Sequence, residues 1–118
     1  MKDCIFCQII NKKIPAEIIY ENDRILAFPD INALAPVHVL IIPKKHIESI
    51  NDLKNEKDGQ NLAGELIMVA QKIAEKKGIS EDGYKLLFRV QKHGQQEVPH
   101  IHLHLIGGAQ LKETIGVA

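Results

Sequence analysis

The chain has 118 residues, and its 15 Lys and Arg balance 15 Asp and Glu, so the formal net charge is zero with histidine counted as neutral. This length predicts one domain, residues 1–118, that buries enough surface to fold without disulfide bonds. With 45% hydrophobic and 25% charged residues, the composition is typical of a globular domain and not of a disordered segment. The balanced charge argues against a general binder of nucleic acid or of membrane surfaces, because both depend on an excess of Lys and Arg.

The N-terminal segment, MKDCIFC, lacks the apolar stretch of a secretory signal peptide, and no apolar run approaches the ~18 residues of a membrane span. We therefore expect a cytoplasmic protein. In a reducing compartment, the spacing of Cys4 and Cys7 favours a metal or redox site over a structural disulfide. A thioredoxin-like site needs a preceding strand, which makes redox chemistry the weaker alternative. The third interpretation is that the two cysteines lie on an amphipathic helix and have no further role.

The first half of the chain predicts one short helix followed by three strands. Apolar residues within 4–12 are spaced as one face of a helix. The β-branched and aromatic runs at 18–20 and 25–28 predict a hairpin, and 37–42 predicts a strand that Pro43 stops.

The second half predicts a long helix and two further strands. After a turn or short helix at 44–47, apolar residues recur every three or four positions from 57 to 77, which predicts a helix with Gly78 as its C-cap. Strands are expected at 84–90 and 98–106. Five strands in hairpin-like succession with one major helix indicate an α+β domain.

Three of the six histidines alternate with apolar residues in the last predicted strand, at His100, His102 and His104. Side chains alternate along a strand, so the three imidazoles share one face, roughly 6.5–7 Å apart, while the apolar residues face the core. An exposed strand face without function is one explanation. Strict alternation of three histidines favours the floor of a functional site.

Two kinds of chemistry fit such a strand. The histidines can bind zinc in a hydrolase, with Asp30 or Glu97 as a further group. Alternatively, one imidazole acts as a nucleophile: with a pKa of about 6.5 it is largely neutral at pH 7 and can attack phosphorus directly. Its neighbours then orient it and donate to phosphate oxygens, and Gly94 permits a loop that approaches an anion.

Further motifs run through nearly the whole chain: CIFC at 4–7, NKKIP at 11–15, LAFPDI at 26–31, APVH at 35–38, IPKKH at 42–46 and QEVPHIHLHLIGG at 96–108. Together they resemble the histidine triad (HIT) family, in particular its HINT-like nucleotide-binding branch of small phosphoramidases. The resemblance implies a five-stranded antiparallel sheet with one long and one or two short helices. It also implies a homodimer that joins two such sheets.

The resemblance further implies a hydrolase or nucleotidyl transferase that acts on P–N or phosphoanhydride bonds at the α-phosphate of a purine nucleotide, typically an adenosine phosphoramidate. His102 resembles the nucleophile that forms a covalent nucleotidyl-histidine, and His104 the residue that contacts the phosphate and leaving group. His100 and His38 resemble supporting histidines. Asp30 resembles the acid that binds the ribose hydroxyls. The other positions similar to the family's nucleotide contacts are Ile5, Phe6, Ile9, Phe28 and Ile31 at the base, and Gln96, Glu97 and Val98 at the phosphate loop.

Related bacterial proteins with CxxC at this end resemble nucleotidyl transferases that hold a structural zinc ion. Carried over to this sequence, the ligands are Cys4, Cys7, His46 and His100, a set suited to Zn²⁺. The zinc would support the nucleophile's strand from behind. No organic cofactor is expected.

The loop before the triad departs from the family pattern. Arg89 replaces the usual Asn, and Gln91 and Gln95 replace glycines. Arg89 either contacts phosphate or faces solvent, and His93 is expected at the surface. The larger side chains support a second hypothesis, that the protein is a catalytically weak nucleotide-binding or interaction module.

Overall fold

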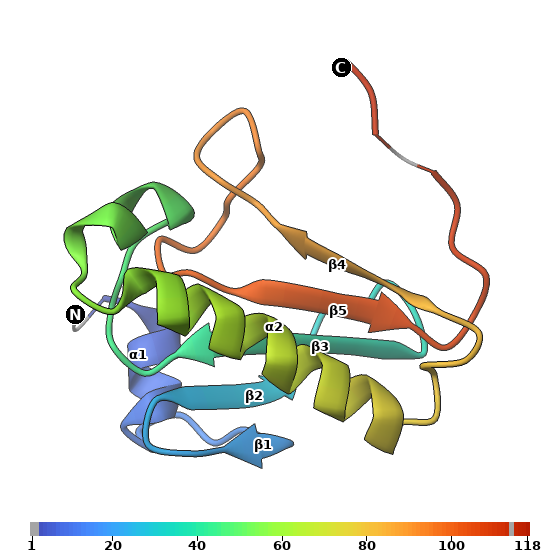
Figure 1. The fold of residues 1–118 in the computed structure, drawn as a ribbon, viewed down its shortest axis with the longest axis horizontal. Coiled ribbons are helices and arrows are strands. Elements are labelled where there is room, and N and C mark those ends of the chain that lie inside the picture. The colour runs from blue at the N-terminus through green and yellow to red at the C-terminus, as the bar shows by residue number, and fades with distance from the viewer. Residues whose placement is uncertain (1–2, 114) are drawn as a thin grey trace.

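The computed structural model describes residues 3–113 and 115–118, in which five strands form one antiparallel sheet (Figure 1). Their order across the sheet is β1-β2-β3-β5-β4, so β5 lies between β3 and β4. The strands span Tyr20–Glu21 (β1), Ile25–Pro29 (β2), Val37–Pro43 (β3), Tyr84–Phe88 (β4) and Leu103–Gly107 (β5). The predicted α+β class with a five-stranded antiparallel sheet is confirmed.

The long helix α2, Gly59–Lys76, covers one face of this sheet (Figure 1). Its buried side chains recur every three or four residues, as the sequence predicts, and they pack on Ile25, Val39, Ile41, Leu103 and Leu105 of the strands. Lys77 is the C-cap, one residue earlier than expected, and Gly78 follows in the left-handed region with φ 73°. Within the described residues, no helix is long and apolar enough to span a membrane.

The short helix α1, Ile5–Ile10, packs on the opposite face. Side chains alternate along a strand, so Leu40 and Ile42 of β3 point away from α2 and contact the residues of α1. His38 lies on the same face as Leu40. The α1 face of the sheet is therefore the one that carries the histidines.

The last predicted strand is shorter than expected, because pairing begins at Leu103 and not at 98. In this register the next pairs would be Ile42 with His102 and Pro43 with Ile101, and Pro43 has no amide hydrogen to donate to a continued ladder. The segment before β5 is held instead by a turn, in which the His100 N–H donates to the Val98 carbonyl, and by the Ile101 N–H, which donates to Ile47.

Two smaller differences concern the first strand and the predicted turn. The expected strand 18–20 is reduced to β1, and the short helix expected at 44–47 lies further along, as the 3₁₀-helix η1 (Ile50–Asn55). A capping box explains its start: Ser49 accepts from the Asn51 N–H while Asp52 accepts from the Ser49 N–H.

Candidate active site

Four buried histidines converge on the α1 face of the sheet: His38, His100, His102 and His104. His38 and His104 come from the paired strands β3 and β5, and the other two come from the segment before β5. The ring centroids of His102 and His104 lie 5.0 Å apart, and those of His102 and Phe6 from α1 lie 5.1 Å apart in a T-shaped arrangement. The structure thus brings together the four histidines that the sequence analysis selects.

Main-chain and side-chain partners determine which nitrogen of His38 and His104 carries the proton. The Leu34 N–H donates to His38 Nδ1 at 3.1 Å, so the hydrogen of the neutral His38 ring is on Nε2. That Nε2 lies 2.9 Å from His104 Nδ1 and 3.3 Å from a carboxylate oxygen of Asp30. Because His38 donates, His104 Nδ1 accepts, and the His104 hydrogen is on Nε2. Within the described part of the chain, His104 Nε2 is the only buried side-chain polar atom without a hydrogen-bond partner.

The opposite tautomer follows for His102. Its Nδ1 lies 2.8 Å from the carbonyl oxygen of His100, and a carbonyl can only accept, so Nδ1 carries the hydrogen. The lone pair of a neutral His102 is therefore on Nε2. His102 and His104 together present an unprotonated nitrogen next to an N–H donor, a combination suited to attack on a group with negatively charged oxygens.

Burial keeps these imidazoles neutral at pH 7. It lowers the pKa of His100 and of His104 to about 4, and it also lowers the pKa of His38 and of His102. For His38, the nearby Asp30 carboxylate opposes this effect of burial. Neutral imidazole is the form that can act as a nucleophile or as a metal ligand.

A second cluster on the same side of the sheet is formed by Cys4, Cys7, His46 and His100, whose ligand atoms all lie within 4.8 Å of one another. Cys4 is the N-cap of α1, and its sulfur accepts from the Cys7 N–H at 3.4 Å. Burial and the adjacent Cys4 thiol raise the pKa of Cys7 to about 11. Two sulfurs and two imidazole nitrogens in this arrangement can hold a metal ion, and a bound cation favours the thiolate form.

His100 connects the two clusters. Its Nε2 lies 2.8 Å from the Pro43 carbonyl and must donate to it, so the unprotonated Nδ1 faces the sulfurs of Cys4, at 3.4 Å, and Cys7, at 3.7 Å. In metal sites, a hydrogen bond from the ring nitrogen that does not bind the metal generally orients the histidine for ligation. The main-chain carbonyl of the same residue accepts from His102. His100 therefore links the group of potential metal ligands to the orientation of His102.

A further group of potential metal ligands, Asp30, His38 and His104, also lies within 4.8 Å. The 2.9 Å hydrogen bond between the two histidines accounts for this proximity. Glu97, the other acid considered for a metal site, is exposed and belongs to neither group.

The predicted base-pocket residues fall into two sets. Phe6, Ile9 and Phe28 are buried in one cluster, with the rings of Phe6 and Phe28 5.5 Å apart. Ile5 and Ile31 are exposed, by 45% and 93%, and do not join that cluster. Asp30 is half-buried at the end of β2, where its N–H donates to the His38 carbonyl.

Of the predicted phosphate-loop residues, Val98 packs against the α1 cluster, Glu97 is exposed, and Gln96 anchors the loop. The Gln96 amide donates to the carbonyls of Glu48 and Val98, at 2.6 and 3.0 Å. Gln91 adds a second anchor, since its amide donates to Ser49 Oγ at 3.1 Å. Ser49 is not among the residues expected at the site, because a single serine between a charged and an apolar residue carries no sequence signal.

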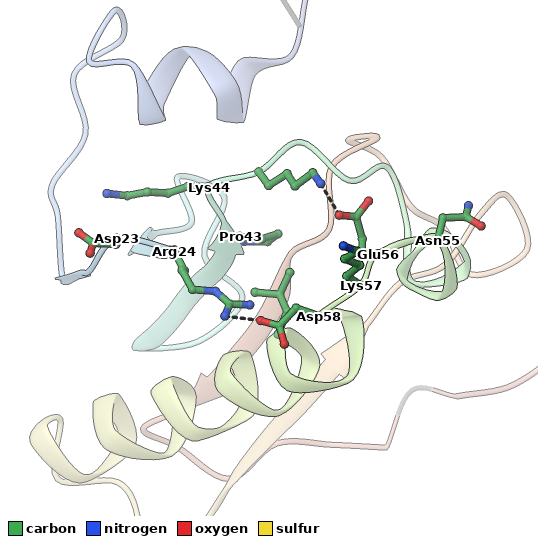
Figure 2. A pocket seen from close by; sticks show the side chains of 10 residues that line it. Asp23, Arg24, Pro43, Lys44, Asn55, Glu56, Lys57 and Asp58 are labelled. Atoms are coloured by element: carbon green, nitrogen blue, oxygen red, sulfur yellow. Dashed lines mark hydrogen bonds and ion pairs between the residues drawn. The ribbon is translucent and has the colours of Figure 1, made fainter.

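Two cavities of the described chain lie away from the histidines. One of about 530 Å³ is lined by residues that include Arg24, Pro43 and Asp58 (Figure 2). None of the six histidines, all in the described part of the chain, lines it. Two of its cations are paired, Arg24 with Asp58 and Lys45 with Glu56, and Figure 2 draws both contacts. The residues that line this cavity include no histidine and no cysteine, so it offers no chemistry comparable to the histidine cluster.

Comparison with known proteins identifies the family of this chain. The sequence profile of the HIT domain matches residues 11–111. The chain belongs to the HIT family. It is 47% identical over 110 residues to a purine nucleoside phosphoramidase of Escherichia coli (strain K12), a match that covers 93% of this chain and 91% of that protein.

Solved structures of HIT proteins have the same architecture. A HIT family hydrolase from Legionella pneumophila Philadelphia 1 superposes with a TM-score of 0.88 at 49% identity, covering 93% of this chain and 96% of that one. A histidine triad protein from Clostridium difficile gives a TM-score of 0.91 at 38% identity, covering 98% of both chains.

Proposed function

We propose that this HIT protein is a purine nucleoside phosphoramidase that works through a covalent nucleotidyl-histidine. The observation that carries the proposal is the pair of opposite tautomers, with the His102 lone pair on Nε2 beside the unpartnered N–H of His104. The similarity to the Escherichia coli phosphoramidase supports the reaction class.

In the proposed reaction, His102 Nε2 attacks the α-phosphorus of an adenosine phosphoramidate. The P–N bond breaks, and the amine leaves with a proton that it takes up from water. His104 Nε2–H donates to the phosphoryl group, where negative charge develops, and His38 holds His104 in the tautomer that allows this. Water then cleaves the bond between phosphorus and His102 and releases the nucleoside monophosphate.

We place the nucleoside on the β2–β3 side of the triad. Asp30 lies there beside His38 and is suited to accept from ribose hydroxyls, while Phe28 and the residues of α1 supply an apolar surface for the purine. Ile31 and Ile5, which are exposed, would become covered when the base binds. Gln96, Glu97 and Val98 would approach the phosphate from the loop.

We further propose that Cys4, Cys7, His46 and His100 hold a structural zinc ion. The donor set of two sulfurs and two imidazoles, with His100 Nδ1 already turned toward the sulfurs, fits Zn²⁺. When bound, the metal would supply rigidity and no chemical step. It would connect α1 and the segment around His46 to His100, whose carbonyl orients His102.

We also propose that residues 1–118 form a single domain that assembles as a homodimer in the cytoplasm. The free thiols of Cys4 and Cys7 suit a reducing compartment. β4 lies at an edge of the sheet, and Ile67 and Met68 of α2 are exposed. Native mass spectrometry would report the dimer and the bound metal together.

The deciding experiment is an acid quench of the enzyme during turnover of an adenosine phosphoramidate. Mass spectrometry of the protein should show one added adenosine monophosphate on the parent and none on His102→Ala. His93→Ala, which changes an exposed histidine of the neighbouring loop, is the matched control and should behave as the parent does. Equal turnover by His102→Ala and the parent would contradict the mechanism.

The loop geometry favours one alternative, a catalytically weak nucleotide-binding module. Gln91 and Gln95 have φ values of 59° and 62°. Residues other than glycine adopt this left-handed backbone conformation only at a cost in free energy. This hypothesis predicts nucleotide binding by calorimetry without a burst of covalent adduct. A burst of adduct in the quench experiment would exclude it.

A further inference from the structure

Arg89 continues the histidine face of the sheet at the level of the proposed nucleophile. The β4–β5 pairing runs through Leu87 opposite His104 and ends at Phe88 opposite Leu103. The ladder ends there, so Arg89 is the first residue after β4 and His102 is the last residue before β5. Side chains alternate along a strand, so continuing the alternation by one residue puts Arg89 on the face of Leu87 and His102 on the face of His104, which is the same face.

The sheet order places opposite charges on the two flanks of the triad. β5 lies between β3 and β4, so His38 and the adjacent Asp30 flank the triad on one side and Arg89 on the other. A carboxylate that binds ribose hydroxyls repels anionic groups. The part of the substrate beyond the attacked phosphorus therefore lies more favourably toward the Arg89 flank.

The Arg89 side chain is oriented but not neutralised. It is half-buried, and its NH1 donates to Gln95 Oε1 at 3.3 Å, an uncharged acceptor. Gln95 is held in its left-handed conformation by its N–H, which donates to the Lys92 carbonyl at 3.0 Å. Within residues 3–113 and 115–118, Arg89 forms no ion pair, so its full charge is available to a ligand.

The charge acts on the site. Burial is the main cause of the lowered pKa of His104, and the positive charge of Arg89 contributes to it. The same holds for His38, although Asp30 opposes burial there. Arg89 is thus close enough to these imidazoles to influence an anion bound beside them.

We propose that Arg89 is a specificity-determining residue that binds an anionic group on the leaving side of the substrate. The enzyme accordingly prefers leaving amines that carry a carboxylate or phosphate over uncharged ones. This inference rests on the proposed function and deepens it. The planar guanidinium suits the task because it pairs with carboxylate or phosphate through two parallel hydrogen bonds.

A pair of substrates that differ in one charge tests the proposal. In both, adenosine monophosphate is linked through a P–N bond to alanine, with a free carboxylate in one and a methyl ester in the other. For the parent, kcat/KM should be higher for the acid. In Arg89→Gln the acid-to-ester ratio should fall about tenfold, the scale of one charge-assisted hydrogen bond. Arg89→Lys should keep part of the preference, because it keeps the charge without the planar fork.

Lys92→Gln is the matched control, since it removes one positive charge from an exposed position of the same loop. Its acid-to-ester ratio should equal that of the parent. A ratio in Arg89→Gln that stays at the parent value overturns the proposal, including the case in which both substrates lose activity equally.

A binding measurement separates this proposal from the proposed function. Calorimetry in the His102→Ala background gives the dissociation constants of the acid and the ester without turnover. If Arg89→Gln lowers the preference for the acid in these dissociation constants by the same factor, the role of Arg89 is supported. This holds even if the parent hydrolyses neither compound, because that result would refute only the phosphoramidase activity. An unchanged ratio of dissociation constants overturns the role of Arg89 whatever the activity.

Discussion

Replacing His38 tests the tautomer argument most directly. In the parent, the imidazole accepts from the Leu34 N–H and donates from Nε2 to His104 Nδ1. His38→Ala leaves His104 Nδ1 buried without a donor, which costs about 1–3 kcal/mol of unfolding free energy. Leu34 is 69% exposed, so its N–H can turn to water and should add little. The lost side chain also leaves a cavity, and we expect a total destabilisation of about 3 kcal/mol.

The effect on catalysis follows from the proton on His104. Without His38, its ring can take the other tautomer, which directs a lone pair and not an N–H toward the phosphoryl group. Loss of one positioned donor of this kind lowers kcat by about 10²–10³, and we expect a fall of this order for His38→Ala. His38→Gln places an amide N–H close to the position of Nε2–H. It should retain activity within about tenfold of the parent, because the donor to His104 is preserved.

Hydrolysis of an adenosine phosphoramidate and urea denaturation, measured on the same preparations, provide the two numbers. Activity of His38→Ala within about threefold of the parent would refute the role of His38 as the residue that sets the tautomer. Equal losses in the Ala and Gln variants would refute it as well, since only the donor distinguishes them.

Three further predictions concern the metal cluster, acid stability and backbone strain. Cys7→Ser should contain less zinc than the parent by elemental analysis, and its free energy of unfolding should fall by up to about 4 kcal/mol, the stabilisation by a ligand present at a thousand times its Kd. An undiminished zinc content would contradict the assigned ligands. The pKa of His104 is about 4 in the folded protein against about 6.5 when unfolded, so below pH 6.5 the unfolded chain binds the extra proton. Unfolding free energy should therefore fall by about 1.4 kcal/mol per pH unit for this group down to pH 4, and the urea midpoint of His104→Gln should depend less steeply on pH. Lys12 has a φ of 62° just after α1, so Lys12→Gly should relieve about 1 kcal/mol of backbone strain and raise the thermal midpoint of unfolding. A lowered midpoint would show that the exposed ion pair of Lys12 with Glu21 stabilises the fold by more than this strain costs.

Periodicity predicts most of the helices and strands. The three-and-four spacing of Leu62, Leu66 and Ile73 predicts α2, and the β-branched run after Val37 predicts the strand that the structure places in the centre of the sheet as β3. Local pairing is less predictable. The start of β5 depends on Pro43, which stands opposite in another strand, so the sequence around position 100 does not reveal where the ladder ends.

The candidate site divides in the same way. The alternation of His100, His102 and His104 identifies the histidine strand, and the spacing of Cys4 and Cys7 indicates a metal or redox site. The resemblance to the HIT family adds His38, and it joins His46 and His100 to the two cysteines. No sequence pattern indicates that the carbonyls of Pro43 and His100 determine which ring nitrogens are protonated, because every residue carries the same main-chain groups.

The sequence by itself therefore determined the family, the element types and the residues able to do chemistry, since these depend on side-chain identity and spacing along one chain. Tertiary structure decided the tautomers of the histidines, the convergence of Cys4 and Cys7 with His46 and His100, and the placement of Arg89 and His102 at the adjoining ends of β4 and β5. These properties depend on atoms that are distant in the sequence and become neighbours only when strands pair and α1 packs on the sheet.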